Sequence, residues 1–241
     1  MKALILSVFI LIFSQVSYGK NLIIGVENID YHPISSIKSG EYAGYARELL
    51  DHFAKEYNHN ITYRPLPIVR LFHELVEDEI DLKFPDNPNW ASDFKQGTDI
   101  TYSQSALSYT DGIMVSADKL GQTKLKTLGI VRGFTPYAVI NEVNQGAIKV
   151  KEFNNIKTLI SIFLNRGDVE GVYFNVAIAS YTMRSLGIDD EIIAFDSSLP
   201  HINGDYFLST VKHTDIIKEF DEFLERNSSF VEKLKEKYGL N

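Results

Sequence analysis

Short apolar runs that alternate with amphipathic helical patterns are the feature that most constrains the fold of this chain. A buried strand over residues 21–26 is followed by apolar positions at i, i+3, i+4 and i+7 spacing over residues 46–57, which indicates a helix. A second strand, a second helix and a third strand follow at residues 61–63, 71–76 and 80–84. This order predicts a parallel sheet with helices on its faces.

The rest of the chain continues this alternation. Further strands are expected at residues 100–102, 112–116, 128–132, 148–152, 171–174, 192–195 and 206–211, and further helices at residues 156–163, 177–186, 216–224 and 230–238. Residues 72–84 and 163–174 share the order helix, acidic turn and buried strand. Two similar α/β lobes of about equal size are therefore expected, with a ligand-binding cleft where their strands end.

Prolines are expected to set two element boundaries. Pro65 and Pro67 should end the strand over residues 61–63, because proline cannot donate a hydrogen bond to a sheet. Thr135-Pro136 has the pattern of a helix N-cap followed by proline at the first helical position. The second pattern predicts a helix that begins directly after Thr135.

Residues 1–19 have the pattern of a signal peptide. Lys2 precedes an apolar run over residues 3–13, and Ser17 and Gly19 supply the small residues that signal peptidase recognises. We expect cleavage after Gly19 and export to a Gram-negative periplasm. The alternative is an uncleaved N-terminal membrane anchor. The sequence has no cysteine, so we expect no disulfide, no thiolate chemistry and no cysteine-linked lipid anchor.

The net charge and the spacing of the histidines argue against nucleic acid, anionic membranes and metal ions as ligands of this protein. The formal net charge of −8 argues against nucleic acid and against anionic membrane as the main partner. The six histidines are scattered without the spacing of a metal site, so we expect them to be structural. No metal and no other cofactor is expected, and we expect a monomer.

Short motifs follow one another in a characteristic order along the predicted mature chain. They are Tyr31-x-Pro33, Gly40-Glu-Tyr-Ala-Gly44-Tyr45, Glu79-Ile-Asp81-Leu82, Ile100-Thr-Tyr102-Ser103 and Gly129-Ile-Val-Arg132-Gly133-Phe-Thr135. Together they resemble the family 3 extracellular solute-binding proteins, the type II periplasmic binding proteins of amino-acid ABC importers. The resemblance covers essentially the whole mature chain. It implies an α/β, two-lobed periplasmic binding protein type II fold, in which each lobe is a mostly parallel sheet flanked by helices and two hinge crossovers join the lobes.

The same resemblance divides the chain and implies a function. After the signal peptide it assigns residues 20–107 to the first lobe, residues 108–211 to the second lobe and residues 212–241 to a return to the first lobe. It implies a periplasmic substrate-binding protein that captures a small polar solute, an amino acid or a related organic anion. The implied partner is an inner-membrane ABC permease or, alternatively, a membrane sensor.

Two charges of the amino-acid-binding members are absent here. Those members carry an arginine after the third strand that grips the ligand carboxylate, but residues 89–95 contain none and Lys95 is only a partial substitute. They also hold the ligand ammonium with an aspartate, and Asn175 stands at that position. Glu27 matches an acidic position of the family and could still hold a cation. The identity of the ligand therefore stays open.

Three further candidates would hold an anion. Arg70 lies where the second helix begins, and its alternative role is a surface ion pair with Glu74 at i+4. Arg132 and Thr135 follow a predicted strand, so that a capped helix start would direct free N–H groups into the cleft. The alternative for Thr135 is helix capping without ligand contact.

Aromatic and amide side chains complete the candidate set. Trp90 is the only tryptophan and lies in a polar loop, where it is expected to form a wall of the cleft rather than to serve packing alone. Tyr31 follows the first strand and is expected to have the same role. The full set of candidate ligand-binding residues is Glu27, Tyr31, Arg70, Asn87, Trp90, Tyr109, Arg132, Thr135 and Asn175.

Two other functions remain open beside transport. An enzyme on the same fold, resembling periplasmic dehydratases, could use Glu27 and Glu48 as acid–base groups. The sequence nevertheless has no Ser-His-Asp order, no carboxylate pair at a defined spacing and no cofactor motif, so we expect no enzyme. A ligand-presenting sensor component would use the same cleft.

Overall fold

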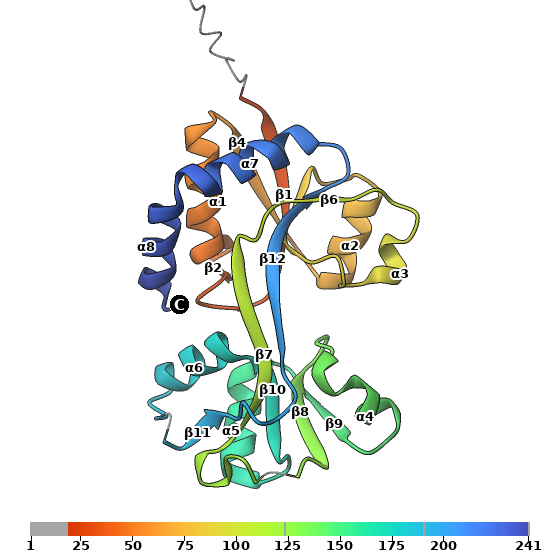
Figure 1. Ribbon diagram of the computed structural model, residues 1–241, viewed down its shortest axis with the longest axis vertical. Helices are drawn as coiled ribbons and strands as arrows, with labels where there is room; N and C mark the ends of the chain where they lie inside the picture. The colour runs from red at the N-terminus through yellow and green to blue at the C-terminus, as the bar shows by residue number, and fades with distance from the viewer. Residues whose placement is uncertain (1–18, 123, 190, 241) are drawn as a thin grey trace, which may run out of the picture.

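Two α/β lobes are joined by two long strands in the computed structural model, which describes residues 19–122, 124–189 and 191–240 (Figure 1). The two strands are β7 (Leu107–Ser116) and β12 (Ile202–Thr210). The predicted two-lobed fold with two crossovers is confirmed. The predicted signal peptide lies outside the described residues, apart from Gly19. Within the described chain, no helix combines the length and apolar character needed to cross a membrane.

The first lobe is built on a parallel sheet. Its central strand β1 (Asn21–Glu27) pairs in parallel with β4 (Asn60–Leu66) and with β5 (Leu82–Asp86). The connecting helices are α1 (Tyr45–Glu56) and α2 (Ile68–Val76). Both helices and all three strands occur where the apolar pattern predicts them. The lobe also contains β2 (Ser36–Lys38), β3 (Glu41–Ala43), α3 (Ser92–Lys95), β6 (Thr101–Tyr102), α7 (Thr214–Arg226) and α8 (Ser228–Tyr238).

The two C-terminal helices pack on the first lobe. The ring of Phe53 in α1 lies 5.2 Å from Phe220 and 5.7 Å from Phe223, both in α7. All three side chains are fully buried. Burial of large aromatic side chains is a strong favourable term in folding, so this contact fixes the end of the chain against α1.

The second lobe repeats the arrangement with one antiparallel strand. Strand β8 (Thr127–Val131) pairs in parallel with β9 (Lys149–Phe153) and with β10 (Gly171–Asn175), and β10 pairs antiparallel with β7. The helices and remaining elements are η1 (Ala117–Lys119), η2 (Tyr137–Val139), α4 (Ile140–Asn144), α5 (Ile156–Arg166), α6 (Val176–Ser185) and β11 (Ile193–Phe195). Both lobes thus direct the loops after their parallel strands toward the other lobe (Figure 1).

The crossover strands pair with each other between the lobes. Residues 107–111 of β7 pair antiparallel with residues 202–206 of β12, and we call this pair of segments the hinge ribbon. Beyond it, β12 pairs with β5 and β6 of the first lobe, while β7 pairs with β10 and β11 of the second. We therefore propose that the second lobe ends near residue 206, earlier than the boundary at residue 211 that the resemblance implies.

Side chains alternate between the two faces of the hinge ribbon, as they do in any strand. The register places six residues on one face, namely Leu107, Tyr109, Asp111, Ile202, Gly204 and Tyr206. It places four others on the opposite face, namely Ser108, Thr110, Asn203 and Asp205. Tyr109 and Tyr206 of the first set stack within the candidate site, and the second set lines a cavity described below, together with Leu107, Tyr109 and Gly204.

Two predicted boundaries are wrong. Strand β4 continues through Pro65, which pairs with Val26, because β4 is the edge strand of the sheet and an edge strand has a side that needs no donor. The segment after Thr135 begins with the 3₁₀ turn η2, whose cap residue is Pro136 and which has no side-chain cap bond. Thr135 therefore does not cap a helix.

Candidate ligand-binding cleft

Three aromatic rings meet where the first lobe contacts the hinge ribbon. Tyr109 stacks on Tyr206 with ring centroids 4.5 Å apart and an interplanar angle of 20°. Trp90, from the loop after β5, lies 6.1 Å from Tyr109 and 5.7 Å from Tyr206. Gly204 leaves the space for this stack, since a Cβ there would lie 2.6 Å from the Tyr109 ring. Two predicted cleft residues, Trp90 and Tyr109, are thus in contact.

A second aromatic group joins the two lobes directly. Tyr31, in the loop after β1, lies 5.7 Å from the ring of Phe134 and 5.4 Å from that of Phe174. Both phenylalanines belong to the second lobe, and their rings are 5.0 Å apart. Tyr31 also interacts electrostatically with Tyr206 of the hinge ribbon. The structure therefore has its lobes closed on each other.

Glu27 is the last residue of β1, and its carboxyl group lies close enough to Tyr31 to act on it electrostatically. The residue is 8% exposed, and no described residue forms a hydrogen bond or an ion pair with its carboxylate. Burial raises the pKa of Glu27 to about 7, with a smaller lowering by Lys83 and a further rise caused by Asp86. A buried carboxylate without a partner carries a free-energy cost when it ionises, so this position favours either a proton or a cation.

Asp111 is a second buried carboxyl group, on the same face of the hinge ribbon as Tyr109. Its Oδ1 is buried and has no hydrogen-bond partner among the described residues. Burial raises the pKa of Asp111 to about 7, and the side chain of Asn175 acts in the opposite direction. Both Glu27 and Asp111 act electrostatically on Tyr31 and Tyr206, whose pKa values burial already raises. The two acids therefore face the same pair of tyrosines.

Asn175 and Asn87 connect this cluster to the backbone around it. The side-chain oxygen of Asn175 accepts a bond from Ile178 N at 3.2 Å, which caps α6, and its Nδ2 lies 3.4 Å from the Tyr206 hydroxyl. Asn87 donates from Nδ2 to the carbonyl of Asp205 at 2.9 Å, which ties the loop after β5 to the hinge ribbon. Both asparagines are buried.

The two lysines near the cluster are already neutralised. Lys83 and Lys95 donate to Oδ1 of Asp86 at 3.1 and 2.8 Å, and Ser209 donates to its Oδ2 at 2.7 Å. Each ammonium also donates to a backbone carbonyl, at 2.6 and 2.7 Å. Burial by itself raises the pKa of Asp86, but Lys83 and Lys95 bring it below its ordinary value. Lys95 is thus held inside the first lobe and does not substitute for a ligand-gripping arginine.

The three residues expected to hold an anion lie outside this cluster. The side chain of Arg70 is 67% exposed and its Nε lies 2.7 Å from Glu74, which is the alternative raised from the i+4 spacing. The side chain of Arg132 is 68% exposed and its Nε lies 3.5 Å from Glu152 on the neighbouring strand. Thr135 is exposed as well. In both arginines a nearby glutamate holds the guanidinium on the surface.

Of the predicted residues, the structure therefore brings together Glu27, Tyr31, Asn87, Trp90, Tyr109 and Asn175. Sequence reasoning missed Asp111, Phe134, Phe174 and Tyr206. Asp111 and Tyr109 are two positions apart, so extending the predicted strand at residues 112–116 backward by three residues would have placed both on one face. Among the described residues, no group of three or more histidine, aspartate or glutamate side chains is arranged to hold a metal ion.

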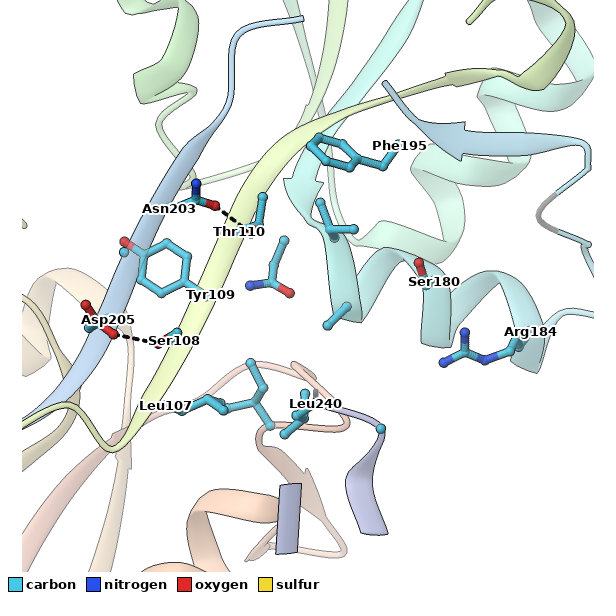
Figure 2. A pocket seen from close by; sticks show the side chains of 16 residues that line it. Leu107, Ser108, Tyr109, Thr110, Ser180, Arg184, Phe195, Asn203, Asp205 and Leu240 are labelled. Atoms are coloured by element: carbon cyan, nitrogen blue, oxygen red, sulfur yellow. Dashed lines mark hydrogen bonds between the residues drawn. The ribbon is translucent and has the colours of Figure 1, made fainter. Parts of the chain in front are cut away.

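A cavity of about 740 Å³ lies against the hinge ribbon, and Tyr109, Asn175 and Gly204 form part of its lining (Figure 2). Its lining includes Ser108, Thr110, Arg184, Phe195, Asn203 and Asp205. Ser108 Oγ donates to Asp205 Oδ1 at 2.8 Å and Thr110 Oγ1 donates to Asn203 Oδ1 at 2.7 Å, so these polar groups satisfy one another. The buried carboxyl groups with unused hydrogen-bonding capacity lie instead in the closed cleft, which we take as the candidate site.

No protein-family model matches the sequence, and no curated protein matches it. Solved structures do match. The ligand-binding core of GluR0 in complex with L-glutamate has a TM-score of 0.71 and 17% identity, over 91% of this chain and 98% of that one. A histidine kinase sensor domain with similarity to periplasmic binding proteins has a TM-score of 0.70 and 15% identity, over 90% and 95%.

A third solved structure is the ancestral amino acid-binding protein AncCDT-1, a precursor of cyclohexadienyl dehydratase. It has a TM-score of 0.69 and 16% identity, over 90% of this chain and 94% of that one. At identities this low the likeness establishes the fold. The resemblance drawn from the motifs is confirmed at that level: the chain has the two-lobed fold of the periplasmic binding proteins.

Proposed function

We propose that this protein is a solute-binding protein, which captures a small polar solute between its two lobes. The observation that carries the proposal is the composition of the closed cleft. Both lobes and the hinge ribbon contribute to it, and it combines aromatic walls with two buried carboxyl groups that have unused hydrogen-bonding capacity. Ligand sites are typically apolar clefts with a few convergent polar groups of this kind.

The hinge ribbon suggests how a solute would enter. Rotation about residues 107–111 and 202–206 would separate Tyr31 from Phe134 and Phe174, because only the ribbon connects the lobes covalently. Opening would expose Glu27 and Asp111 to solvent. A bound solute would then occupy the space between the aromatic walls, and closure would shield it from water.

The setting of this function follows from the sequence. The signal-peptide pattern of residues 1–19 supports export, and we propose a periplasmic, monomeric protein that delivers its solute to an inner-membrane ABC permease. Two solved structures of the same fold, the GluR0 core and AncCDT-1, are described as binding L-glutamate and amino acids, which supports a small polar ligand.

A thermal-shift screen of the purified protein tests this proposal. The panel contains amino acids, amines, small organic acids and short peptides, and a ligand that binds only the folded state raises the melting temperature. The expected result is a saturable rise for a narrow chemical group of compounds. A flat response across the panel, from protein that circular dichroism shows to be folded, would contradict the proposal.

An enzyme is the second candidate, and one observation favours it. Glu27 and Asp111 have pKa values near 7, which suits general acid–base chemistry at neutral pH. Incubating a hit compound with the protein and analysing it by mass spectrometry separates the two roles, because a binding protein returns its ligand unchanged. A sensor component, supported by the likeness to the histidine kinase sensor domain, would also return it unchanged.

A further inference from the structure

The charge distribution in the closed cleft indicates the chemical class of the solute. We infer that it is a small organic ammonium ion that carries no carboxylate, with its positive charge facing Glu27 and Asp111. This inference rests on the proposed function, and it departs from the organic anion that Arg70 and Arg132 led us to expect. Three independent features of the cleft support it.

The first feature is the state of the two carboxyl groups. Glu27 is 8% exposed, and no hydrogen bond or ion pair to a described residue satisfies its carboxylate. Asp111 Oδ1 is buried and equally without a partner in the described chain. Buried polar atoms are nearly always paired in folded proteins, so Asp111 Oδ1 lacks a group that the cleft is built to receive. An ammonium ion supplies hydrogen-bond donors and positive charge together.

The second feature is the aromatic surface around these carboxyl groups. Rings surround the cleft from the first lobe, the second lobe and the hinge ribbon: Tyr31, Trp90, Tyr109, Phe134, Phe174 and Tyr206. The face of an aromatic ring attracts a cation, and the attraction strengthens where water is excluded. Aromatic rings together with carboxylates are therefore suited to an ammonium group and its hydrocarbon chain.

The third feature is the lack of a partner for a ligand carboxylate. Arg70 and Arg132 are exposed and paired with glutamates outside the cleft. Lys83 and Lys95 both donate to Asp86 within the first lobe. A carboxylate bound among the described cleft residues would face two acidic groups without a neutralising cation, which is strongly unfavourable in a buried site. An amino acid is therefore a poorer ligand than the amine that lacks its carboxyl group.

Matched pairs of ligands test the inference with the full protein. Isothermal titration calorimetry compares each amino acid with its decarboxylated amine: arginine with agmatine, lysine with cadaverine, ornithine with putrescine, histidine with histamine and tyrosine with tyramine. We expect at least one amine to bind ten times more tightly than its parent. We also expect that binding to be lost when N-acetylation removes the charge of the amine, as in N-acetyltyramine or in putrescine and cadaverine acetylated on both nitrogens. Equal or tighter binding of the parent amino acid, or binding of an organic acid, overturns the inference and leaves the proposed function intact. Absence of binding by every solute contradicts both.

Variants locate the charge. Asp111→Asn and Glu27→Gln preserve side-chain volume, and each is expected to weaken binding of the amine at least tenfold. Arg184→Ala is the matched control, since Arg184 is exposed and does not belong to the cluster of aromatic and carboxyl groups in the cleft. Unchanged affinity in both cleft variants overturns the inference. If a variant is misfolded by circular dichroism, the N-acetyl comparison on the unaltered protein decides, because it requires no substitution.

Discussion

Tyr31 of the first lobe stacks on Phe134 of the second lobe with ring centroids 5.7 Å apart and an interplanar angle of 17°. The two residues are far apart in the sequence, and each follows a parallel strand of its lobe, β1 for Tyr31 and β8 for Phe134. Their contact closes the cleft over Glu27 and Asp111 and buries Tyr31 to 6% exposure. The closed arrangement of the two lobes is therefore stabilised by contacts between side chains of the protein, in addition to those that a bound solute would make.

Removing this contact should favour the open form. Tyr31→Ala deletes a ring that packs on both Phe134 and Phe174, which costs the closed state up to about 3 kcal/mol of packing. Small-angle scattering of the ligand-free variant should show a larger radius of gyration than the wild type. Tyr137→Ala, at an exposed tyrosine of the same lobe as Phe134, should leave the scattering unchanged. Superimposable curves for Tyr31→Ala and wild type would contradict this prediction.

The single tryptophan should report ligand binding. Trp90 contacts Tyr109 and Tyr206 on the cleft face of the hinge ribbon, so a solute that enters or moves the lobes changes its surroundings. We expect a saturable change in fluorescence with the same dissociation constant that calorimetry gives. Trp90→Phe should abolish the signal and preserve binding within about threefold, because the phenylalanine ring retains an aromatic wall. If saturating ligand leaves the tryptophan fluorescence unchanged, Trp90 is not part of the binding site.

Asp86 should be essential for stability. Its carboxylate is fully buried and accepts hydrogen bonds from Lys83, Lys95 and Ser209. Asp86→Ala leaves two buried ammonium groups without a counter-ion, and the expected loss in the free energy of unfolding is about 3–5 kcal/mol in urea titrations. Ser209→Ala removes one hydrogen bond and should cost about 1 kcal/mol. Equal losses in the two variants would show that the lysines do not depend on Asp86.

The ligand-free protein should lose stability as the pH rises toward neutrality. Burial raises the pKa values of Glu27 and Asp111 from 4.5 and 3.8 to about 7, so between those limits the folded state binds more protons than the unfolded state. Under that condition the free energy of unfolding falls with rising pH. The groups that interact with the two acids are Lys83, Asp86, Asn175, the tyrosines of the cleft, and Tyr42 and Tyr173.

Melting temperatures measured between pH 5 and pH 8 check this dependence. They should decrease across this interval in the wild type, and the decrease should be smaller when Glu27→Gln and Asp111→Asn are combined. The amine ligand should restore stability most at pH 8, where the carboxylates are ionised. A melting temperature that rises with pH in the wild type and no longer does so in the double variant would contradict this prediction.

The exposed arginines should matter little for binding. Arg70 and Arg132 are exposed and pair with Glu74 and Glu152 outside the cleft, so neither guanidinium lies among the groups that would hold a solute there. Arg70→Ala and Arg132→Ala should therefore keep ligand affinity within about twofold of the wild type in calorimetry. A tenfold loss in either variant would restore the anion-binding role that the sequence led us to expect.

The apolar periodicity of the chain was sufficient to predict most elements of the two lobes. Helices such as α1 and α5, and strands such as β1 and β10, bury one face or both, so their sequences have a period that can be recognised. The positions of Glu27, Tyr31, Trp90 and Asn175 after such elements could be predicted for the same reason. Loops that follow parallel strands meet at one edge of the sheet.

The sequence by itself did not determine the hinge ribbon or the orientation of the arginines. Residues 107–111 and 202–205 alternate polar and apolar side chains without a continuous apolar run, because they pair mainly with each other between the lobes. Their strand structure, and with it the placement of Asp111 and Tyr206 against Tyr31, depends on a pairing between segments distant in the sequence. The sequence allowed Arg70 and Arg132 to point into the cleft or to pair with a neighbouring glutamate. In the structure Arg70 pairs with Glu74 on the same helix, and Arg132 pairs with Glu152 on the adjacent strand. Local periodicity thus determined the lobes, whereas long-range pairing and competition between charges decided which side chains meet in the cleft.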